Sequence, residues 1–272
     1  MLGSHVYETL KNKHVFELIS SSRTSSTDVE FNYRIMGLGS LLKKLRPNII
    51  INCIAVTSPS SSILKSFKVN GILPIHLAIL ALRFKAKVVH ISTNAVFSGT
   101  RSSNLESTFS IPHSRYGVSK LVGDLALFNS LVIRTSFVGF SNRSSSAKGL
   151  VNELVHLPVN SSYQIQENFK WNGITAGALS EFIFSAIKLQ DFPKGIIHLG
   201  TIEKVSRLQL VELLLIHLGR FDISVTVSSS EVTRNLSLDS KKGELISQIW
   251  INSCYGFVPT LNQLIQELPV SS

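Results

Sequence analysis

Residues 86–93 read Ala-Lys-Val-Val-His-Ile-Ser-Thr, an apolar run that ends in two hydroxyl side chains. A short apolar run between polar residues is typical of a strand that is buried on both faces. Similar runs occur at 48–56 and 130–136, and a helical pattern separates each run from the next. Strands that alternate with helices in this way form a parallel sheet covered on both faces.

This alternation extends over most of the chain. We expect strands at Lys13–Ser20, Asn48–Val56, Ala86–Thr93, Ser130–Ser136 and Gly195–Gly200, and an extended run at Asp222–Ser228. We expect helices at Met36–Leu45, Val69–Phe84, Ser114–Asn129, Val151–Leu157, Thr175–Leu189, Ser206–Leu218 and Pro259–Glu267. The predicted fold class is α/β, a Rossmann-like doubly wound parallel sheet with a smaller C-terminal α+β lobe. We assign residues 1–138 and 172–218 to the Rossmann-like domain and residues 139–171 and 219–272 to the smaller lobe.

The beginning of the chain departs from this pattern. A doubly wound domain opens with a strand and a glycine-rich turn that receives a cofactor pyrophosphate at a helix N-terminus. Here the chain begins Met1-Leu2-Gly3-Ser4-His5-Val6, and Val6–Leu10 already has a helical pattern. Either the true start lies upstream of Met1 or the chain is a degenerate copy. We favour an upstream start, because the rest of the pattern is well kept.

The composition limits the classes of partner. The chain has 272 residues, of which 16% are charged, and 27 Lys and Arg against 17 Asp and Glu give a net charge of +10. A basic chain favours anionic partners, but the basic residues are scattered, so we expect a phosphate-bearing cofactor and substrate and no nucleic acid. The N-terminus lacks a signal-peptide pattern, and no run reaches about 18 apolar residues. The sequence predicts a cytoplasmic protein that does not bind a membrane.

Candidate catalytic side chains lie in the run Ser114-Arg115-Tyr116-Gly117-Val118-Ser119-Lys120. Tyr116 and Lys120 are four residues apart on a predicted helix and therefore share a face. The reference pKa of a phenol is about 10, and lowering it by about 3 requires about 4 kcal/mol of preferential stabilisation of the phenolate. A neighbouring ammonium group can supply this stabilisation. The pair therefore predicts a general acid or base, although the same spacing also occurs by chance.

Polar side chains end two of the predicted strands. Ser92 and Thr93 follow one buried strand, and Arg134-Thr135-Ser136 end the next. Because the carboxyl ends of parallel strands meet at one edge of the sheet, we expect these residues to lie close together with Tyr116. The alternative is that Ser92 and Thr93 only cap the end of their strand. His76, His90 and His198 lie in apolar surroundings, and neither they nor Cys53 and Cys254 have the spacing of metal ligands, so no metal is predicted.

The ordered motifs resemble those of a known family. They include Arg46–Cys53, Val69–Pro74, Ser92–Gly99, Tyr116–Lys120, Ile133–Ser136, Trp171–Thr175 and Arg234–Asp239. These segments are similar to the extended short-chain dehydrogenase/reductases, and within them to the dTDP-4-dehydrorhamnose reductase-like, sugar-nucleotide-binding branch. The resemblance covers nearly the whole chain.

The resemblance implies a role for each matching position. Thr93 would hydrogen-bond the substrate carbonyl, Tyr116 would protonate it, and Lys120 would lower the tyrosine pKa and hold the nicotinamide ribose. The implied cofactor-binding residues, besides Tyr116 and Lys120, are Gly3, Asp28, Val29, Asn52, Cys53, Ile54 and Asn70. The implied substrate-binding residues are Asn94, Arg134, Thr135, Trp171, Asn172 and Arg234.

The cofactor is predicted from the residues after the expected strand Lys13–Ser20. NAD-binding proteins usually place a carboxylate there to hold the ribose 2′-hydroxyl. Here Ser20-Ser21-Ser22-Arg23 follow, and hydroxyls with a guanidinium suit a 2′-phosphate. We therefore expect Arg23 to bind NADPH, in preference to NADH.

The resemblance implies NADPH-dependent reduction of a keto-sugar nucleotide, most simply dTDP-4-dehydrorhamnose to dTDP-rhamnose, in surface-polysaccharide sugar biosynthesis. A homodimer is compatible with the sequence. The branch usually has aspartate and an aromatic residue or cysteine where this chain has Asn94 and Ala95, which leaves the substrate open. The alternative is a non-catalytic regulatory or scaffold subunit, resembling the regulatory subunit of methionine adenosyltransferase. An epimerase or dehydratase fits less well, because dehydratases commonly have an acidic residue at the position of Asn94.

Overall fold

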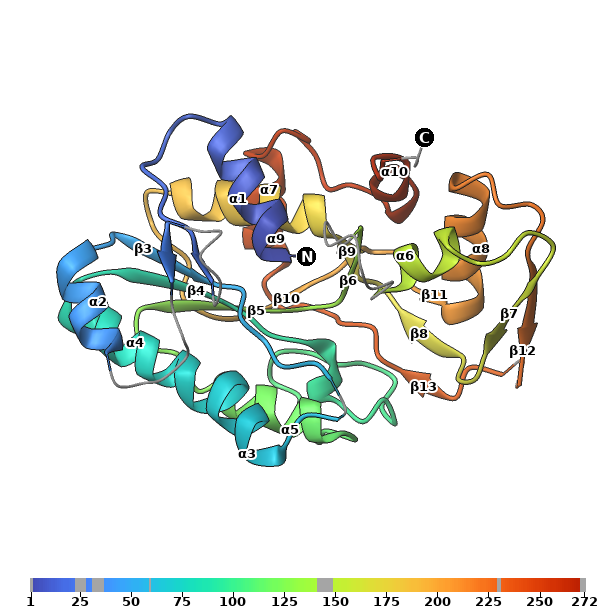
Figure 1. The fold of residues 1–272 in the computed structure, drawn as a ribbon, viewed down its shortest axis with the longest axis horizontal. Coiled ribbons are helices and arrows are strands. Elements are labelled where there is room, and N and C mark those ends of the chain that lie inside the picture. The colour runs from blue at the N-terminus through green and yellow to red at the C-terminus, as the bar shows by residue number, and fades with distance from the viewer. Residues whose placement is uncertain are drawn as a thin grey trace.

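A parallel sheet lies at the centre of the larger part of the molecule (Figure 1). The structure is a computed structural model that describes residues 2–22, 28–30, 37–58, 60–140, 149–228 and 231–269. Within those ranges the sheet has four strands in the order β10-β5-β4-β3, and every neighbouring pair is parallel. The strands of this sheet are β3 (Ile49–Asn52), β4 (Lys87–Ile91), β5 (Ser130–Thr135) and β10 (Gly195–Leu199).

The other strands are short and form small sheets. They are β1 (Ser21–Ser22), β2 (Val29–Glu30), β6 (Phe137–Val138), β7 (Ser162–Ile165), β8 (Phe169–Trp171), β9 (Ile174–Thr175), β11 (Val205–Ser206), β12 (Ser224–Val227) and β13 (Arg234–Asn235). The helices are α1 (Leu2–Asn12), α2 (Leu38–Leu45), α3 (Ile63–Ser66), α4 (Leu73–Arg83), α5 (Arg115–Gly123), α6 (Leu150–Val155), α7 (Ala176–Lys188), α8 (Arg207–His217), α9 (Gly243–Ile251) and α10 (Leu261–Gln266). A π-helix, η1 (Phe67–Ile72), joins α3 to α4, and a 3₁₀ turn, η2 (Asn94–Val96), follows β4.

Helices cover both faces of the sheet because successive residues of its strands point to opposite sides. Val89 and Ile91 of β4 pack in a core that includes side chains of α1, α7 and α9. Val88 packs on the other face with Ala81 of α4. Figure 1 shows α1, α7 and α9 on one side of the sheet and α2, α4 and α5 on the other. This two-sided burial explains why the central strands are continuous apolar runs.

Helix α5 is held close to η1 by a glycine. A Cβ atom at Gly123 would lie 2.2 Å from the backbone oxygen of Asn70, so only glycine allows the two helices to approach at this point. The side chain of Asn70 donates a hydrogen bond to Ser119 Oγ at 2.9 Å, which fixes α5 further. These two contacts fix the orientation of α5, and so the direction in which the face with Tyr116 and Lys120 points relative to the sheet.

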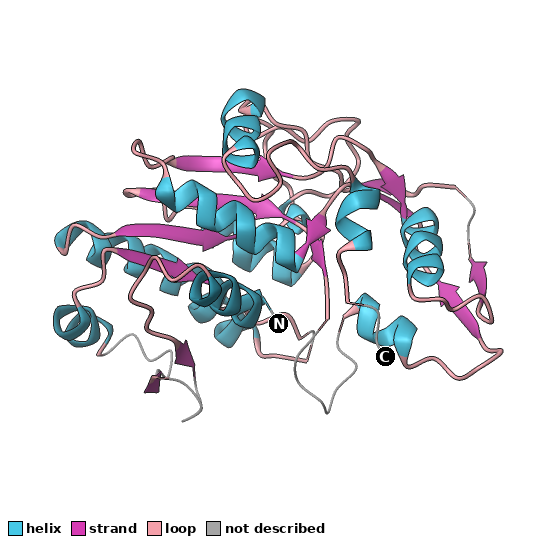
Figure 2. Cartoon of the chain, turned by 90° about the horizontal axis from the view of Figure 1, so that it is seen from above, coloured by secondary structure: helices cyan, strands magenta, loops and turns pink. Residues whose placement is uncertain are grey.

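A second group of helices and short strands, which includes β7, β12 and α8, lies beyond the end of the central sheet (Figure 1 and Figure 2). This part of the molecule contains a second apolar cluster. It includes Leu154 of α6, Trp171 of β8, Leu214 of α8 and Ile265 of α10. Helix α8 thus contributes to this second cluster, whereas α9 contributes to the core of the sheet. The expected domain boundaries stay a prediction. A division by apolar cores would place α8 in the smaller lobe and α9 in the Rossmann-like domain, the opposite of the expected assignment.

The predicted fold class is confirmed. The expected strand Lys13–Ser20 is wrong, because β1 begins only at Ser21 and His14 has a φ of 51°, in the left-handed region that strands do not adopt. The Ser20 carbonyl, at the end of the run, accepts a hydrogen bond from the Val29 N–H of β2 at 3.1 Å. Helix α5 ends at Gly123, earlier than expected. The periodicity of the sequence also failed to indicate α9 and most of the short strands outside the central sheet.

One helical stretch of the described residues, Ile63–Arg83, is long and apolar enough to cross a membrane by length and composition. It consists of α3, η1 and α4, and it packs against α5 and β4 of the same chain. Leu73 and Ala78 in this stretch are completely buried.

Candidate active site

Thr93, Tyr116 and Lys120 are brought together at the carboxyl end of β4. Thr93 follows the strand and caps η2, where its hydroxyl accepts a hydrogen bond from the Ala95 N–H at 3.1 Å. Tyr116 lies in the first turn of α5 and hydrogen-bonds to the Thr93 side chain. A Cβ atom at Gly117 would lie 2.1 Å from the backbone oxygen of Ala95, so a glycine is required for α5 to begin this close to η2.

The Lys120 ammonium is buried below the tyrosine. Its Nζ atom donates a hydrogen bond to the Ile91 carbonyl at 2.6 Å, and the side chain lies one turn along α5 from Tyr116. Burial lowers the pKa of Lys120 to about 8, and the negative charge of Asp124 opposes this change. The lysine therefore carries its charge at neutral pH in a place where a charge is costly.

Burial raises the pKa of the Tyr116 phenol above its ordinary value. The hydrogen bond with Thr93 acts in the opposite direction, and the charge of Asp124 adds to the rise. Lys120 is not among the groups that shift this pKa in the structure, so the expected lowering by the ammonium stays a prediction. A protonated phenol next to a threonine hydroxyl can donate a proton to a carbonyl oxygen.

A buried ion pair lies beneath this group. Asp124, at the C-terminal end of α5, accepts a hydrogen bond from Arg134 Nε of β5 at 2.7 Å and another from the Ser92 hydroxyl. The Arg134 guanidinium also lies 3.3 Å from His198 Nε2 and 5.4 Å from the centre of the Phe97 ring. Arg134 therefore connects α5, β5 and β10.

The residues expected to run along the cofactor follow β3. The loop after Asn52 is fixed by Asn70, whose side-chain oxygen accepts from the Val56 N–H at 2.8 Å and whose amide donates to the Val56 carbonyl at 2.9 Å. Asn52 is buried and its amide lies 3.1 Å from His90 Nδ1. Cys53 is half-buried against the core of the sheet and Ile54 is exposed. The Asn70 side chain thus holds this loop in place through the backbone of Val56.

The predicted cofactor-binding residues near the N-terminus lie on different elements of the structure. Gly3 lies in the first turn of α1, where a Cβ atom would lie 3.7 Å from the Cys53 side chain, and His5 of the same helix contacts the Phe140 carbonyl at 3.1 Å. Asp28 is exposed and accepts hydrogen bonds from the Ser20 N–H and hydroxyl at 2.7 and 2.8 Å. Val29 begins β2. Arg23 lies outside the described residues.

A hollow of about 260 Å³ lies beside η2. Two predicted substrate-binding residues line it, Asn94 and Trp171. Asn94 donates a hydrogen bond to the Leu236 carbonyl at 2.9 Å, and the Trp171 indole donates to the Ser136 hydroxyl at 2.7 Å. The remaining lining residues are Ser136, Phe137, Val138, Gly139, Gly149, Leu150, Phe169, Arg207 and Leu236. Asn94 directly follows Thr93 in the chain, whereas Thr93, Tyr116 and Lys120 are not among the residues that line the hollow.

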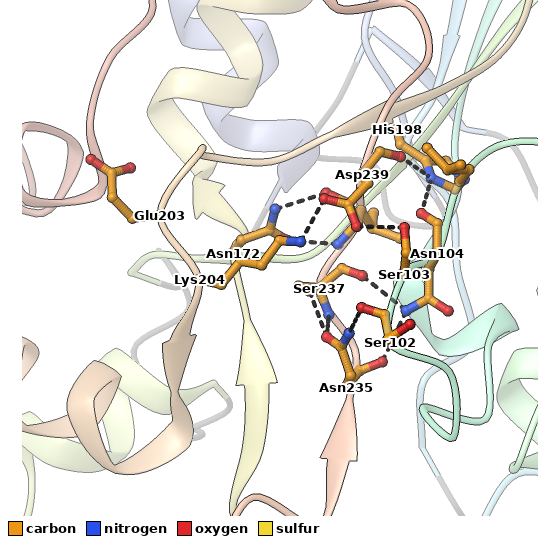
Figure 3. A network of polar contacts seen from close by, with 12 residues as sticks. Ser102, Ser103, Asn104, Asn172, His198, Glu203, Lys204, Asn235, Ser237 and Asp239 are labelled. Atoms are coloured by element: carbon orange, nitrogen blue, oxygen red, sulfur yellow. Dashed lines mark hydrogen bonds and ion pairs between the residues drawn. The ribbon is translucent and has the colours of Figure 1, made fainter.

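The other predicted substrate-binding residues do not line this hollow. Thr135 is buried and donates to the Ser136 carbonyl at 3.3 Å, and Arg134 is buried as described above. Asn172 donates to the carbonyls of Thr201 and Leu238 and accepts from the Leu238 N–H, as part of the polar network in Figure 3. Arg234 forms an ion pair with Glu167. The substrate roles of these four residues stay predictions.

Asn94 and Trp171 are the only described lining residues that the sequence predicted as site residues; among those it missed are Phe169 and Arg207. Phe169 is two residues before Trp171 on β8, and side chains two apart on a strand share a face, so this alternation could have identified it. Arg207 is the first residue of α8, and nothing in the sequence around it indicates a ligand. In the described part of the chain, no group of three or more His, Cys, Asp or Glu side chains could hold a metal ion.

The comparisons with known proteins identify relatives of this chain. Residues 1–235 match the family described as the RmlD substrate binding domain. A dTDP-4-dehydrorhamnose reductase from Aggregatibacter actinomycetemcomitans is 34% identical over 108 residues, which are 36% of this chain and 36% of that protein. The match thus spans about a third of the length of this relative.

Solved structures share the fold over a greater length. The crystal structure of a dTDP-4-dehydrorhamnose reductase from Clostridium acetobutylicum has a TM-score of 0.77 at 20% identity, and the match covers 98% of this chain and 94% of that one. The Bacillus anthracis dTDP-4-dehydrorhamnose reductase in complex with NADP has a TM-score of 0.72 at 18% identity, with 87% and 84% of the chains covered. The expected dTDP-4-dehydrorhamnose reductase-like branch is confirmed. This chain belongs to the RmlD substrate binding domain family.

Proposed function

We propose that the protein reduces a keto-sugar nucleotide with NADPH, most simply dTDP-4-dehydrorhamnose to dTDP-rhamnose, as a cytoplasmic step of surface-polysaccharide sugar biosynthesis. The observation that carries the proposal is the grouping of Thr93, Tyr116 and Lys120 at the carboxyl end of β4. The hollow lined by Asn94 and Trp171 offers a place for the substrate beside this group. The relative from A. actinomycetemcomitans, named for this reaction, supports the choice.

The chemistry follows from the environment of each residue. Tyr116 keeps its proton, because burial raises its pKa, and donates it to the substrate carbonyl oxygen. The Thr93 hydroxyl, which hydrogen-bonds to the phenol, orients the same oxygen. The positive charge of Lys120, one helical turn away, stabilises the phenolate that remains after proton transfer.

The residues present are compatible with a nicotinamide cofactor. When bound, the cofactor would supply the hydride. Lys120 and Tyr116 would hold its nicotinamide ribose, and the loop after Asn52, which Asn70 fixes, would line its path. Lys120 Nζ donates to the Ile91 carbonyl, and an ammonium group can donate three hydrogen bonds, so it retains donors for ribose hydroxyls.

The test is the oxidation of NADPH in the presence of dTDP-4-dehydro-6-deoxy-L-mannose. The wild-type protein should oxidise NADPH only when the keto sugar is present, and more readily than NADH. Tyr116→Phe should lower the rate by about 10²- to 10⁴-fold, because it removes only the proton donor. Tyr255→Phe is the control, since Tyr255 follows α9 and its hydroxyl donates a hydrogen bond to Glu267 at the end of α10. Full activity of Tyr116→Phe would refute the assigned role.

The second candidate is a non-catalytic regulatory or scaffold subunit. One observation favours it: the branch usually has an aspartate at the position of Asn94, and here the neutral Asn94 side chain donates a hydrogen bond to the Leu236 carbonyl at 2.9 Å. Calorimetric titration with NADPH separates the two functions. Binding of NADPH that is weakened by Lys120→Met supports the reductase, whereas the absence of binding to the wild-type chain supports the scaffold.

A further inference from the structure

A second hollow, of about 320 Å³, adjoins the one beside η2. It is lined by Tyr163, Gln164, Ile165, Gln166, Glu167, Phe169 and Arg207. Phe169 and Arg207 line both hollows and therefore lie at their junction. Each hollow alone is at or below the lower end of the range of about 300–1,000 Å³ typical of small-molecule sites. The two together can accept an elongated ligand.

Arg207 is a positive charge without an acidic partner. None of the ion pairs among the described residues includes Arg207, and its guanidinium lies 5.8 Å from the centre of the Phe169 ring. The carboxylate that lines the second hollow, that of Glu167, already pairs with Arg234 through two hydrogen bonds. A capping box between Ser206 and Gln209 fixes the start of α8 and so the position of Arg207.

We propose that Arg207 binds the diphosphate of a nucleoside-diphosphate sugar, with the sugar in the first hollow and the nucleoside in the second. This inference rests on the proposed function for the sugar part of the ligand. A guanidinium presents paired donors that match phosphate oxygens, and an arginine at the junction of two hollows can bind the middle of an elongated anion.

The direction of the ligand follows from the lining of each hollow. The first hollow contains Asn94, which follows Thr93, so the reacting carbonyl belongs there. The second contains the aromatic side chains of Tyr163 and Phe169, against which a nucleobase can stack. The Glu167 carboxylate would repel phosphate and can accept hydrogen bonds from ribose hydroxyls. The diphosphate therefore lies between the hollows, at Arg207.

The experiment is calorimetric titration with dTDP and with thymidine, without NADPH. The wild-type chain should bind dTDP more tightly than thymidine. Arg207→Gln should weaken dTDP binding by about 10- to 100-fold, the value of one charged hydrogen-bonded contact, and leave thymidine binding unchanged. Lys170→Gln is the matched control: it removes one positive charge from the middle of β8, where the side chain is exposed and lines neither hollow.

Three results would overturn the proposal: equal wild-type affinity for dTDP and thymidine, unchanged dTDP binding in Arg207→Gln, or an equal loss in Lys170→Gln. If Arg207→Gln does not fold, Arg207→Lys serves instead and should weaken dTDP binding selectively, because lysine lacks the paired donors. The test is independent of Tyr116. A selective loss in Arg207→Gln together with an inactive wild-type enzyme would leave the diphosphate site intact and refute only the proposed reaction.

Discussion

Two arginines of this chain, Arg134 and Arg207, occupy opposite surroundings. Arg134 is buried in the sheet, where it pairs with Asp124, contacts His198 and lies over the ring of Phe97. Arg207 lies half-buried at the junction of two hollows, beside an aromatic ring, and none of the ion pairs among the described residues includes it. The two residues have the same type of side chain, but Arg134 is shielded from water and Arg207 is partly exposed to it.

The difference follows from the cost of burying charge. An ion removed from water must be paired and hydrogen-bonded, so the polar groups of the sheet region bind to one another. A half-exposed arginine can stay unpaired at little cost and keeps its donors for a ligand. The surroundings of the two arginines therefore indicate different roles: Arg134 holds the sheet region together, and Arg207 keeps its donors for a ligand.

The largest effect is expected for breaking the buried pair. Asp124→Asn should lower the free energy of unfolding by about 3–5 kcal/mol, because the charge of Arg134 stays buried without its partner. Urea denaturation followed by circular dichroism measures this change. Asp191→Asn makes the same chemical change at an exposed residue and should alter stability by no more than about 0.5 kcal/mol. Equal effects of the two variants would contradict the comparison.

The second prediction concerns the charge of Lys120, which is buried and forms no ion pair with any carboxylate of the described residues. Burial lowers its pKa from 10.5 to about 8. Between these values the unfolded chain binds more protons than the folded one, so the stability of the wild type should rise with pH. Below pH 8 the buried charge costs roughly 3 kcal/mol. Lys120→Met should therefore be more stable than the wild type at neutral pH, although inactive.

This advantage should shrink as the pH rises from 8 to 10.5, where the wild-type lysine becomes neutral in both states. Urea denaturation at several pH values measures the trend. Lys44→Met, at an exposed position of α2, is the control and should show no such dependence on pH. A Lys120→Met variant that is less stable than the wild type at pH 7 would show that the hydrogen bond to Ile91 outweighs the burial of the charge.

The central strands could be predicted from the sequence because burial on both faces requires continuous apolar runs, as in β4 and β5. The expectation failed at Lys13–Ser20, where His14 has a left-handed φ of 51° and the described strand begins only at Ser21. Short strands escaped prediction for a different reason. Arg234–Asn235 pairs with Phe169–Lys170, and two-residue pairings between distant segments leave no periodicity to detect.

The candidate site shows the same limit. Thr93, Tyr116 and Lys120 could be predicted because a strand end and a helix face bring them together. Trp171 and Asn172 are neighbours in one motif, yet Trp171 lines the hollow and Asn172 binds backbone groups in the network of Figure 3. Successive side chains point in different directions, and only the fold shows which direction leads to the hollow.

The smallest effect is expected at Arg234, which lies between the two extremes of the comparison. Its pair with Glu167 is bidentate, but the two side chains are 23% and 43% exposed. Water therefore screens the pair, and a double-mutant cycle of Arg234→Gln and Glu167→Gln should give a coupling energy of about 0.2–1 kcal/mol. Urea denaturation of the four proteins measures it. A coupling of about 3 kcal/mol or more, as expected for a buried pair, would show that exposure does not separate the two classes of arginine. A small coupling would mean that Arg234 can exchange Glu167 for a ligand at low cost, which is the condition for its predicted role in substrate binding.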